Sequence, residues 1–305
     1  MTTVTNGTLA FYRRAALQMG DLRAQAETLQ DQLATGERLQ RSSDDPVAAS
    51  RLRMLARDER LAGIDAANAR RTSEDMELAG NALESIGNDL IRARELALWA
   101  ASETLGDTER RAIGEEFAQL RERILSSANA RDAGGNALFG GETSGNAYEQ
   151  AASGVVSYIG TTSAGQIDLG QGQLLSRGMT GPEALTFTSG ATTTDVFAFL
   201  ATAGAALAGG AADPAAAARD ALPMLDDAIE ALTRAQTVTG TRIAWIEVIQ
   251  DRQIDQQQTR AQRTSDAGGV PFAQTVAELQ QMLTVLEASQ AGFTRLASLS
   301  LFNSI

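Results

Sequence analysis

Carboxylates, hydroxyls and guanidinium groups are the side chains with which this sequence could do chemistry, because three other reactive types are missing. The 305-residue chain has no His and no Cys, and all 26 of its basic residues are Arg. Thiolate nucleophiles, imidazole acid–base catalysis and lysine Schiff bases are therefore excluded. Carboxylate pairs can hydrolyse glycosides, but no constellation of that kind stands out. We predict that the protein is not an enzyme.

Two adjacent acids, Asp44 and Asp45, could form half of a site for a hard metal ion. Asp45 also precedes Pro46, and this pair is typical of a helix start, where Asp caps the first amides and Pro takes the first position. We therefore interpret Asp44, Asp45 and Pro46 as a helix start, and predict neither a metal nor a cofactor. The glycine pairs at 134–135 and 140–141 lack the spacing of a phosphate-binding loop, which favours turns.

Charge and hydropathy exclude several classes of partner. The formal net charge is −12, which argues against nucleic acid, because phosphate binding is driven by basic residues. No apolar run approaches the length of about 20 residues that spans a bilayer, so we predict no membrane insertion. The polar start of the chain has no basic segment followed by an apolar one, which argues against a cleaved signal peptide.

Apolar residues at heptad spacing mark a helix at each end of the chain. The N-terminal seam consists of Tyr12, Met19, Leu22, Leu29 and Leu33, with Ala15 and Ala26 between them. The C-terminal seam consists of Phe272, Val276, Leu279, Leu283, Leu286 and Phe293, followed by Leu299, Leu301 and Phe302. Such narrow faces are typical of helices that need partners. We predict that the two ends pack on each other and on neighbouring copies, so that a charge at Leu283 blocks assembly.

The segments between these ends predict the fold class. Long helical patterns begin at Pro46 and Pro214, whereas residues 133–218 are rich in Gly and poor in charge, with short strand candidates at 155–159, 166–169 and 185–188. We predict a mainly α protein, with a long helical coiled-coil rod formed by both chain ends and a small β-rich insert (α+β overall). The predicted segments are a terminal assembly helix at 1–40, a helical rod at 41–141, the insert at 142–194, a second rod at 195–267 and a terminal assembly helix at 268–305.

Several short motifs, in this order, resemble the bacterial flagellin superfamily and, within it, the hook-associated proteins of the hook–filament junction. They are the segment 33–50 around Ser-Ser-Asp-Asp-Pro, the segments 82–97 and 110–116, Gly-Asn-Ala-Leu-Phe-Gly-Gly at 135–141, Thr-Gly-Thr-Arg at 239–242 and the ending Leu-Ser-Leu-Phe at 299–302. Pro46 and this ending resemble the junction proteins more than the flagellins. The chain departs from the family at Val270–Phe272, where an acidic residue usually opens the last helix, and at Ala137, where an aromatic residue is usual.

The resemblance implies a structural role in the flagellum as the adaptor that lets the filament assemble on the hook. It implies self-assembly, a hook-associated protein as the hook-side neighbour, and flagellin or its adjoining protein on the filament side. It also implies an export chaperone at the C-terminal helix, an extracellular location, and export through the flagellar type III apparatus without a cleaved signal. Two alternatives stay open at this point, a flagellin that forms the filament itself and a carboxylate enzyme on the insert.

Overall fold

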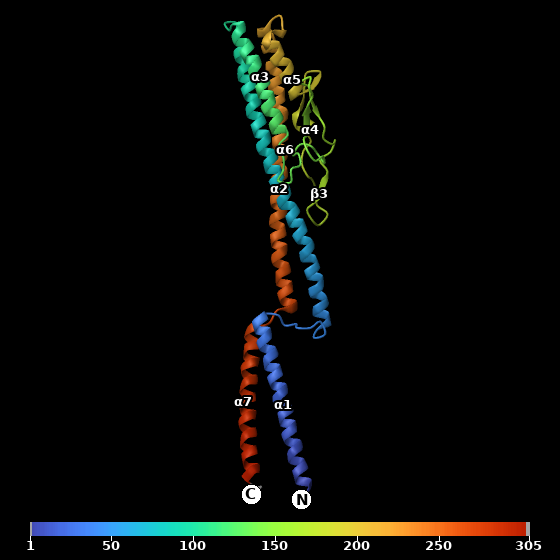
Figure 1. Ribbon diagram of the computed structural model, residues 1–305, viewed down its shortest axis with the longest axis vertical. Helices are drawn as coiled ribbons and strands as arrows, with labels where there is room; N and C mark the ends of the chain where they lie inside the picture. The colour runs from blue at the N-terminus through green and yellow to red at the C-terminus, as the bar shows by residue number, and fades with distance from the viewer. Residues whose placement is uncertain (1, 303–305) are drawn as a thin grey trace. The chain divides into compact units, whose positions relative to one another are not determined.

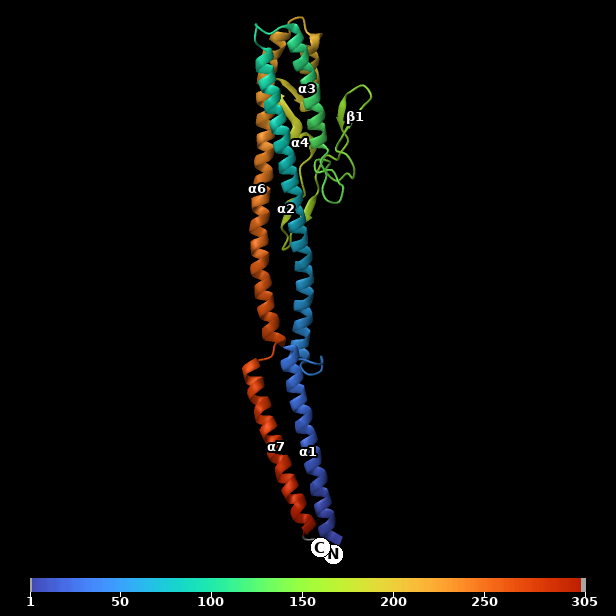
Figure 2. The same cartoon turned by 60° about the vertical axis from the view of Figure 1, so that its left-hand side comes forward.

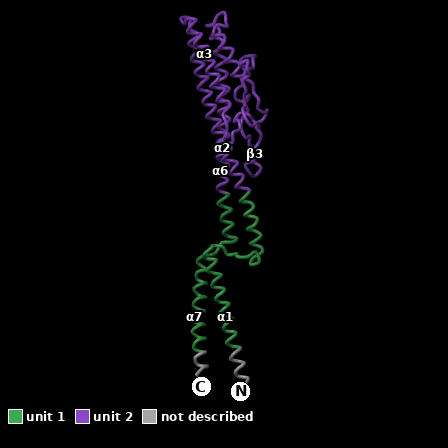
Figure 3. The backbone as a smooth tube through the Cα atoms, viewed as in Figure 1, with its two compact units in different colours: residues 1–60, 256–305 green, residues 61–255 purple. Residues whose placement is uncertain are grey.

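The computed structural model describes residues 2–302, and the side chains of residues 10–295. The chain divides into two compact units, which are coloured separately in Figure 3. One unit combines residues 1–60 with 256–305, and the other comprises residues 61–255. Two long helices, α2 (Pro46–Ala100) and α6 (Pro214–Gly268), contribute residues to both units. The predicted class, mainly α with a small β-rich part, is confirmed.

The core of unit 61–255 lies where α2, α6 and α3 (Asp107–Ala128) run side by side, as Figures 1 and 2 both show. The heptad positions of α2 face this core, including the fully buried Leu83, Ile86 and Leu90. Phe117 and Leu120 of α3 fill the space opposite them. Each buried aliphatic or aromatic side chain contributes about 1.5–3 kcal/mol to folding, so this three-helix region supplies most of the stability of the unit.

The turn between α2 and α3 has no side-chain cap at the start of α3, although Asp107 is a residue that favours the capping position. Asp107 is the first residue of α3, and the capping position belongs to Gly106, which has no side chain to accept a hydrogen bond. The turn is instead closed by Arg110, whose buried guanidinium donates to the carbonyl oxygens of Ala100 and Ser102, at 3.1 and 2.7 Å. Asp107 lies in the first turn of α3, where its negative charge interacts favourably with the helix dipole.

The β-rich part consists of three antiparallel hairpins. They pair β1 (Tyr148–Gln150) with β2 (Val156–Tyr158), β3 (Gln166–Asp168) with β4 (Leu174–Ser176), and β5 (Thr186–Ser189) with β6 (Thr192–Asp195). The short helix α4 (Gly181–Leu185) precedes β5. The predicted strand segments correspond to β2, β3 and β5. Their partners β1, β4 and β6 were missed, because strands of three or four residues carry too little alternation to be recognised.

The hairpin of β3 and β4 is held against the two long helices. Leu169, which follows β3, is buried with Ala69 and Met76 of α2 and with Ile246 and Ile249 of α6. The amide of Gln253 donates to the carbonyl oxygen of Leu169 at 2.8 Å, and Arg242 donates to that of Gly178 at 2.6 Å. The hairpin is therefore docked on α2 and α6 by apolar packing and by hydrogen bonds to its backbone.

Another helix, α5 (Val196–Ala205), returns the chain from the hairpins to the bundle. Asp195 caps it by accepting from the amide of Ala198, and a wide helical turn at Ala206–Gly210 follows. A Cβ added to Gly114 of α3 would lie 2.6 Å from the carbonyl oxygen of Gly204. Glycine is therefore required at Gly114, where α3 and α5 approach each other closely.

Unit 1–60 with 256–305 contains the helices of both chain ends, α1 (Thr2–Thr35) and α7 (Phe272–Phe302), packed against each other. Gly36 ends α1 with a φ of +73°, a conformation that suits glycine. The break before α7 falls at 269–271, where the sequence Gly-Val-Pro predicts it. A short β-bridge joins Glu37 to Gly269, so the two ends of the chain are also connected at these turns.

Candidate assembly surfaces

The inner face of α1 is the heptad row that the sequence identifies. Tyr12, Met19, Leu22, Leu29 and Leu33 are all half-buried, and Ala26 between them is buried. The rings of Tyr12 and Phe293 meet edge to face across the helix pair, with centroids 5.3 Å apart. The five residues therefore form one continuous face along α1, turned toward α7.

The inner face of α7 differs in part from the predicted seam. The less exposed residues are Thr275, Val276, Leu279, Met282, Leu286, Ser289 and Phe293. Two predicted members lie elsewhere, since Phe272 is 65% exposed and Leu283 is 38% exposed. Leu283 follows Met282 and points about 100° away from it around the helix. Leu283 thus does not face α1 within one chain, where Met282 takes that place; its role between copies stays a prediction.

The predicted seam continues toward the end of the chain. Leu299, Leu301 and Phe302 belong to α7 by their backbone, but their side chains lie outside the described residues.

The outer faces of the α1–α7 pair carry apolar side chains that the described residues do not cover. They are Phe11 and Leu17 of α1 and Leu283 of α7, and Phe272 at the start of α7 is exposed as well. An open hollow of about 450 Å³ lies between the two helices, beside Met19, Leu22, Val285 and Phe293. Exposed apolar surface of this kind is typical of an interaction site. The helix pair is therefore incompletely packed by itself.

The turn between α1 and α2 is fixed by Asp44, Asp45 and Arg38. Asp45 precedes Pro46, the first residue of α2, and its carboxylate accepts from the amide of Ala48 at 2.9 Å. Asp44 accepts from the amide of Arg41 at 2.8 Å. Arg38 donates to Asp45 at 3.3 Å and to the carbonyl oxygen of Ala267 at 3.2 Å.

The two aspartates thus bind backbone amides and a guanidinium. The hydrogen bond from the amide of Ala48, followed by the contact with Arg38, holds the pKa of Asp45 below its usual value. The role of Arg38 was not predicted from the sequence, because one arginine in a charged segment carries no pattern.

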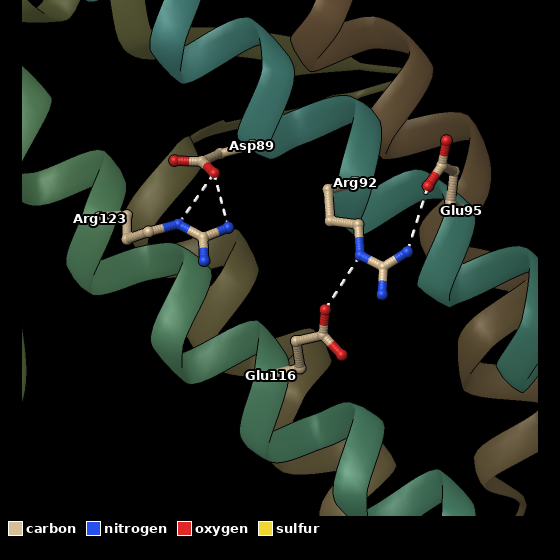
Figure 4. A network of polar contacts seen from close by, with 5 residues as sticks. All are labelled: Asp89, Arg92, Glu95, Glu116 and Arg123. Carbon is tan, nitrogen blue, oxygen red and sulfur yellow. Dashed lines mark hydrogen bonds and ion pairs between the residues drawn. The ribbon is translucent and has the colours of Figure 1, made fainter.

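Some ion pairs of unit 61–255 connect helices. Figure 4 shows Arg123 of α3 donating to Asp89 of α2 at 2.7 Å, and Arg92 of α2 donating to Glu116 of α3 at 3.0 Å. Exposed pairs of this type contribute at most about 1 kcal/mol each. Among the residues whose side chains are described, no three acidic groups lie close enough together to hold a metal ion. These ion pairs therefore add a little to a contact between α2 and α3 that the buried core holds.

None of the helices described within residues 2–302 combines the length and the apolar composition needed to cross a membrane.

The sequence of this chain is similar to those of known flagellar proteins. Residues 8–144 match the family model of the bacterial flagellin N-terminal helical region. The chain is 26% identical to flagellar hook-associated protein 3 of Escherichia coli, over 93% of this chain and 94% of that protein.

Solved structures support the fold. A putative flagellar hook-associated protein of Vibrio parahaemolyticus aligns with a TM-score of 0.67 at 23% identity, covering 74% of this chain and all of that one. FlgL of Xanthomonas campestris aligns with a TM-score of 0.62 at 18% identity, covering 69% of this chain and 99% of that one.

Proposed function

We propose that this chain is a member of the bacterial flagellin superfamily, whose N-terminal model matches residues 8–144. Within it, the chain is a structural subunit of the flagellum, the adaptor at the junction of hook and filament, with no catalytic activity. The observation that carries the proposal is the extent of the similarity to flagellar hook-associated protein 3. That similarity covers 93% of this chain and 94% of that protein. The observation favours a junction protein over a filament subunit.

Both terminal helices take part in assembly under this proposal. Their inner faces pack on each other, and their outer faces, with Phe11, Leu17, Phe272 and Leu283 exposed, pack on neighbouring copies. A two-helix pair with a narrow apolar face is weakly stable alone. The contacts between copies therefore supply the stability that the pair lacks, and the predicted seam residues act through both faces.

The partners follow from a place at the junction. Copies of the chain associate with one another, with a hook-associated protein on the hook side, and with flagellin or its adjoining protein on the filament side. An export chaperone covers the C-terminal helix before assembly, because exposed residues such as Phe272 and Leu283 would otherwise aggregate. The subunit works outside the cell, in the flagellum, after export without cleavage of a signal peptide.

A deletion strain tests the proposal. Cells that lack the chain should carry hooks without filaments and release flagellin into the medium, and the full-length chain supplied in trans should restore filaments. Electron microscopy and the protein content of the medium give the readout. Normal filaments in the deletion strain would refute the proposal. Identification of this chain as the main protein of purified wild-type filaments would favour the flagellin alternative.

A truncated chain tests the role of α7. Removal of residues 272–305 should abolish the rescue of filaments, while unit 61–255 still folds, because its core contains no residue of α7. Circular dichroism and thermal unfolding of the truncated chain check the second part. Rescue by the truncated chain would contradict the assembly role of the C-terminal seam.

A further inference from the structure

A groove opens between the start of α2 and the end of α6, within unit 1–60 with 256–305. It has a volume of about 740 Å³, and its lining includes Leu39, Leu52, Leu55 and Ala56, with Ala261 and Gly268 opposite them. In unit 61–255 the helix α3 packs Phe117 and Leu120 against these same two helices. No described helix covers the groove in this way, so its apolar floor is left without a partner. We call it the α2–α6 groove.

The same stretch of α2 presents bulky apolar side chains on another side. Val47 is 80% exposed and Met54 is 65% exposed. They lie seven residues apart and so share one side of the helix. At about 100° per residue, this side is roughly 120° from the one formed by Leu52, Leu55 and Glu59. The Val47–Met54 face and the α2–α6 groove therefore lie on separate sides of α2, and one copy can use both at once.

Both features lie at the same height along the helix pair. A Cβ at Gly268 would lie 2.7 Å from the side chain of Leu52, and Arg260 donates to Glu59 at 2.9 Å. The groove thus extends along α2 from Leu52 to Glu59, and Met54 falls within that range. A second copy placed beside the first at the same height would bring its Met54 opposite this groove.

The charges around the two features are complementary. Arg51 and Arg57 flank Met54 on the exposed side of α2, and neither has an ion-pair partner among the described residues. The groove carries Glu37 near Leu52, through the bridge of Glu37 with Gly269, and Glu59 at its other end. A second copy placed in this way brings its Arg51 opposite Glu37, whereas Glu59 already accepts from Arg260 of its own chain.

We propose that the α2–α6 groove is filled, in the assembled state, by the Val47–Met54 face of α2 from an adjacent copy of this chain. Each copy contributes its Val47–Met54 face to one neighbour and its α2–α6 groove to the other. The contact is therefore heterologous, and it closes into a ring or continues as one turn of a helix. The inference rests on the proposed function, because it requires copies to stand side by side. The contact is small and forms only when the terminal helices bring copies together.

Chemical crosslinking between copies tests the contact, and the absence of native Cys makes the experiment clean. A strain that lacks the chain would produce two full-length forms with different tags, Met54→Cys and Ala261→Cys. Isolated flagella would then be treated with a short bismaleimide. The expected product is a dimer that carries both tags, since each chain has a single thiol and the link can form only between copies.

The control replaces Met54→Cys by Arg53→Cys, an exposed position of α2 that points away from both the groove and the Val47–Met54 face. No mixed dimer above background is expected from it. If Met54→Cys itself does not restore filaments, Val47→Cys takes its place. A mixed dimer that forms equally from Met54→Cys and Arg53→Cys, or from neither, in flagella that carry normal filaments overturns this inference and leaves the proposed function intact.

Charge exchange gives a second measure. Arg51→Glu and Glu37→Arg should each lower the yield of the Met54→Cys–Ala261→Cys dimer by about two- to fivefold, the range for one exposed ion pair. The two changes together should restore the yield. Unchanged yields in both single variants would contradict the placement of Arg51 opposite Glu37. Normal filaments in cells that lack the chain would instead refute the proposed function itself.

Discussion

Replacement of Leu169 by Ala should undock the hairpin of β3 and β4 from the long helices. Leu169 is only 1% exposed and packs with Ala69, Met76, Ile246 and Ile249 in a small cluster, separate from the main core. The hydrogen bond from Gln253 goes to the backbone carbonyl of Leu169 and survives the change. The substitution therefore removes apolar packing alone, and its effect measures what this packing contributes.

The expected loss follows from the burial of Leu169. A buried Leu replaced by Ala costs about 2–5 kcal/mol, depending on how far the neighbours close the cavity. The Leu169 cluster is small and lies beside a hairpin that can shift, which places the cost at the lower end, about 2–3 kcal/mol. For a unit of this size, 1 kcal/mol changes the thermal midpoint by roughly 2–4 °C, so we expect a decrease of about 4–12 °C.

Thermal unfolding of the full-length chain, followed by circular dichroism, gives the midpoint, and hydrogen exchange of residues 166–176 gives the local effect. The matched control is Leu174→Ala, the same chemical change in the same hairpin, because Leu174 is 61% exposed. The control should alter the free energy of unfolding by no more than about 0.5 kcal/mol. Equal midpoints and equal exchange rates for Leu169→Ala and Leu174→Ala would refute the claim that Leu169 docks the hairpin.

Three further predictions concern other parts of the chain. Met282→Asp should weaken the contact of α7 with α1 while Leu283→Asp leaves it intact, because Met282 is half-buried and Leu283 is exposed. Bismaleimide crosslinking of Tyr12→Cys with Phe293→Cys reports this contact. Equal losses of crosslinked product in the two variants would contradict the assignment. Arg110→Met should lower the free energy of unfolding by about 1.5–3 kcal/mol, measured by urea denaturation against the exposed Arg111→Met, because Arg110 donates to two carbonyl oxygens. Desolvation, together with the charge of Asp132, raises the pKa of Asp75 above its ordinary value of 3.8, so Asp75→Asn should raise the thermal midpoint at pH 7. This gain should shrink as the pH falls through the raised pKa and vanish below 3.8, where Asp75 is protonated in both states; a gain independent of pH would show that the charge is not the cause.

Sequence patterns predict the long helices well, because caps and breakers mark their ends. Both Asp–Pro pairs precede helices, since α2 begins at Pro46 and α6 at Pro214. Gly36 and the Gly-Val-Pro segment at 269–271 likewise separate the terminal helices from the long ones. These signals are local, so they need no knowledge of tertiary contacts.

Features that depend on contacts between distant residues could not be predicted. Arg38 and Arg110 stabilise turns by donating to backbone carbonyl oxygens, and a carbonyl acceptor leaves no trace in the sequence. The docking of Leu169 depends on how the hairpin folds back onto α2 and α6. The close approach of Gly114 to Gly204 is likewise set by the crossing of two helices.

The face that α7 turns toward α1 was predicted only in part, and the reason bears on function. Two heptad rows overlap on α7 and share Leu279, Leu286 and Phe293. The row turned toward α1 adds Thr275, Met282 and Ser289, whereas Leu283 of the other row is exposed, as is Phe272 at the start of the shared row. Burial within one chain would favour the more apolar row.

The opposite arrangement is therefore informative. Apolar side chains on the outside of a helix pair are unfavourably exposed to water unless another molecule covers them. Such departures from the local pattern are expected at functional surfaces. The exposed Phe272 and Leu283 fit a helix that packs on its own chain through one face and on neighbouring copies through the other. The predicted C-terminal seam thus combines residues of both faces. A heptad pattern alone cannot separate them, because packing within a subunit and packing between subunits obey the same period.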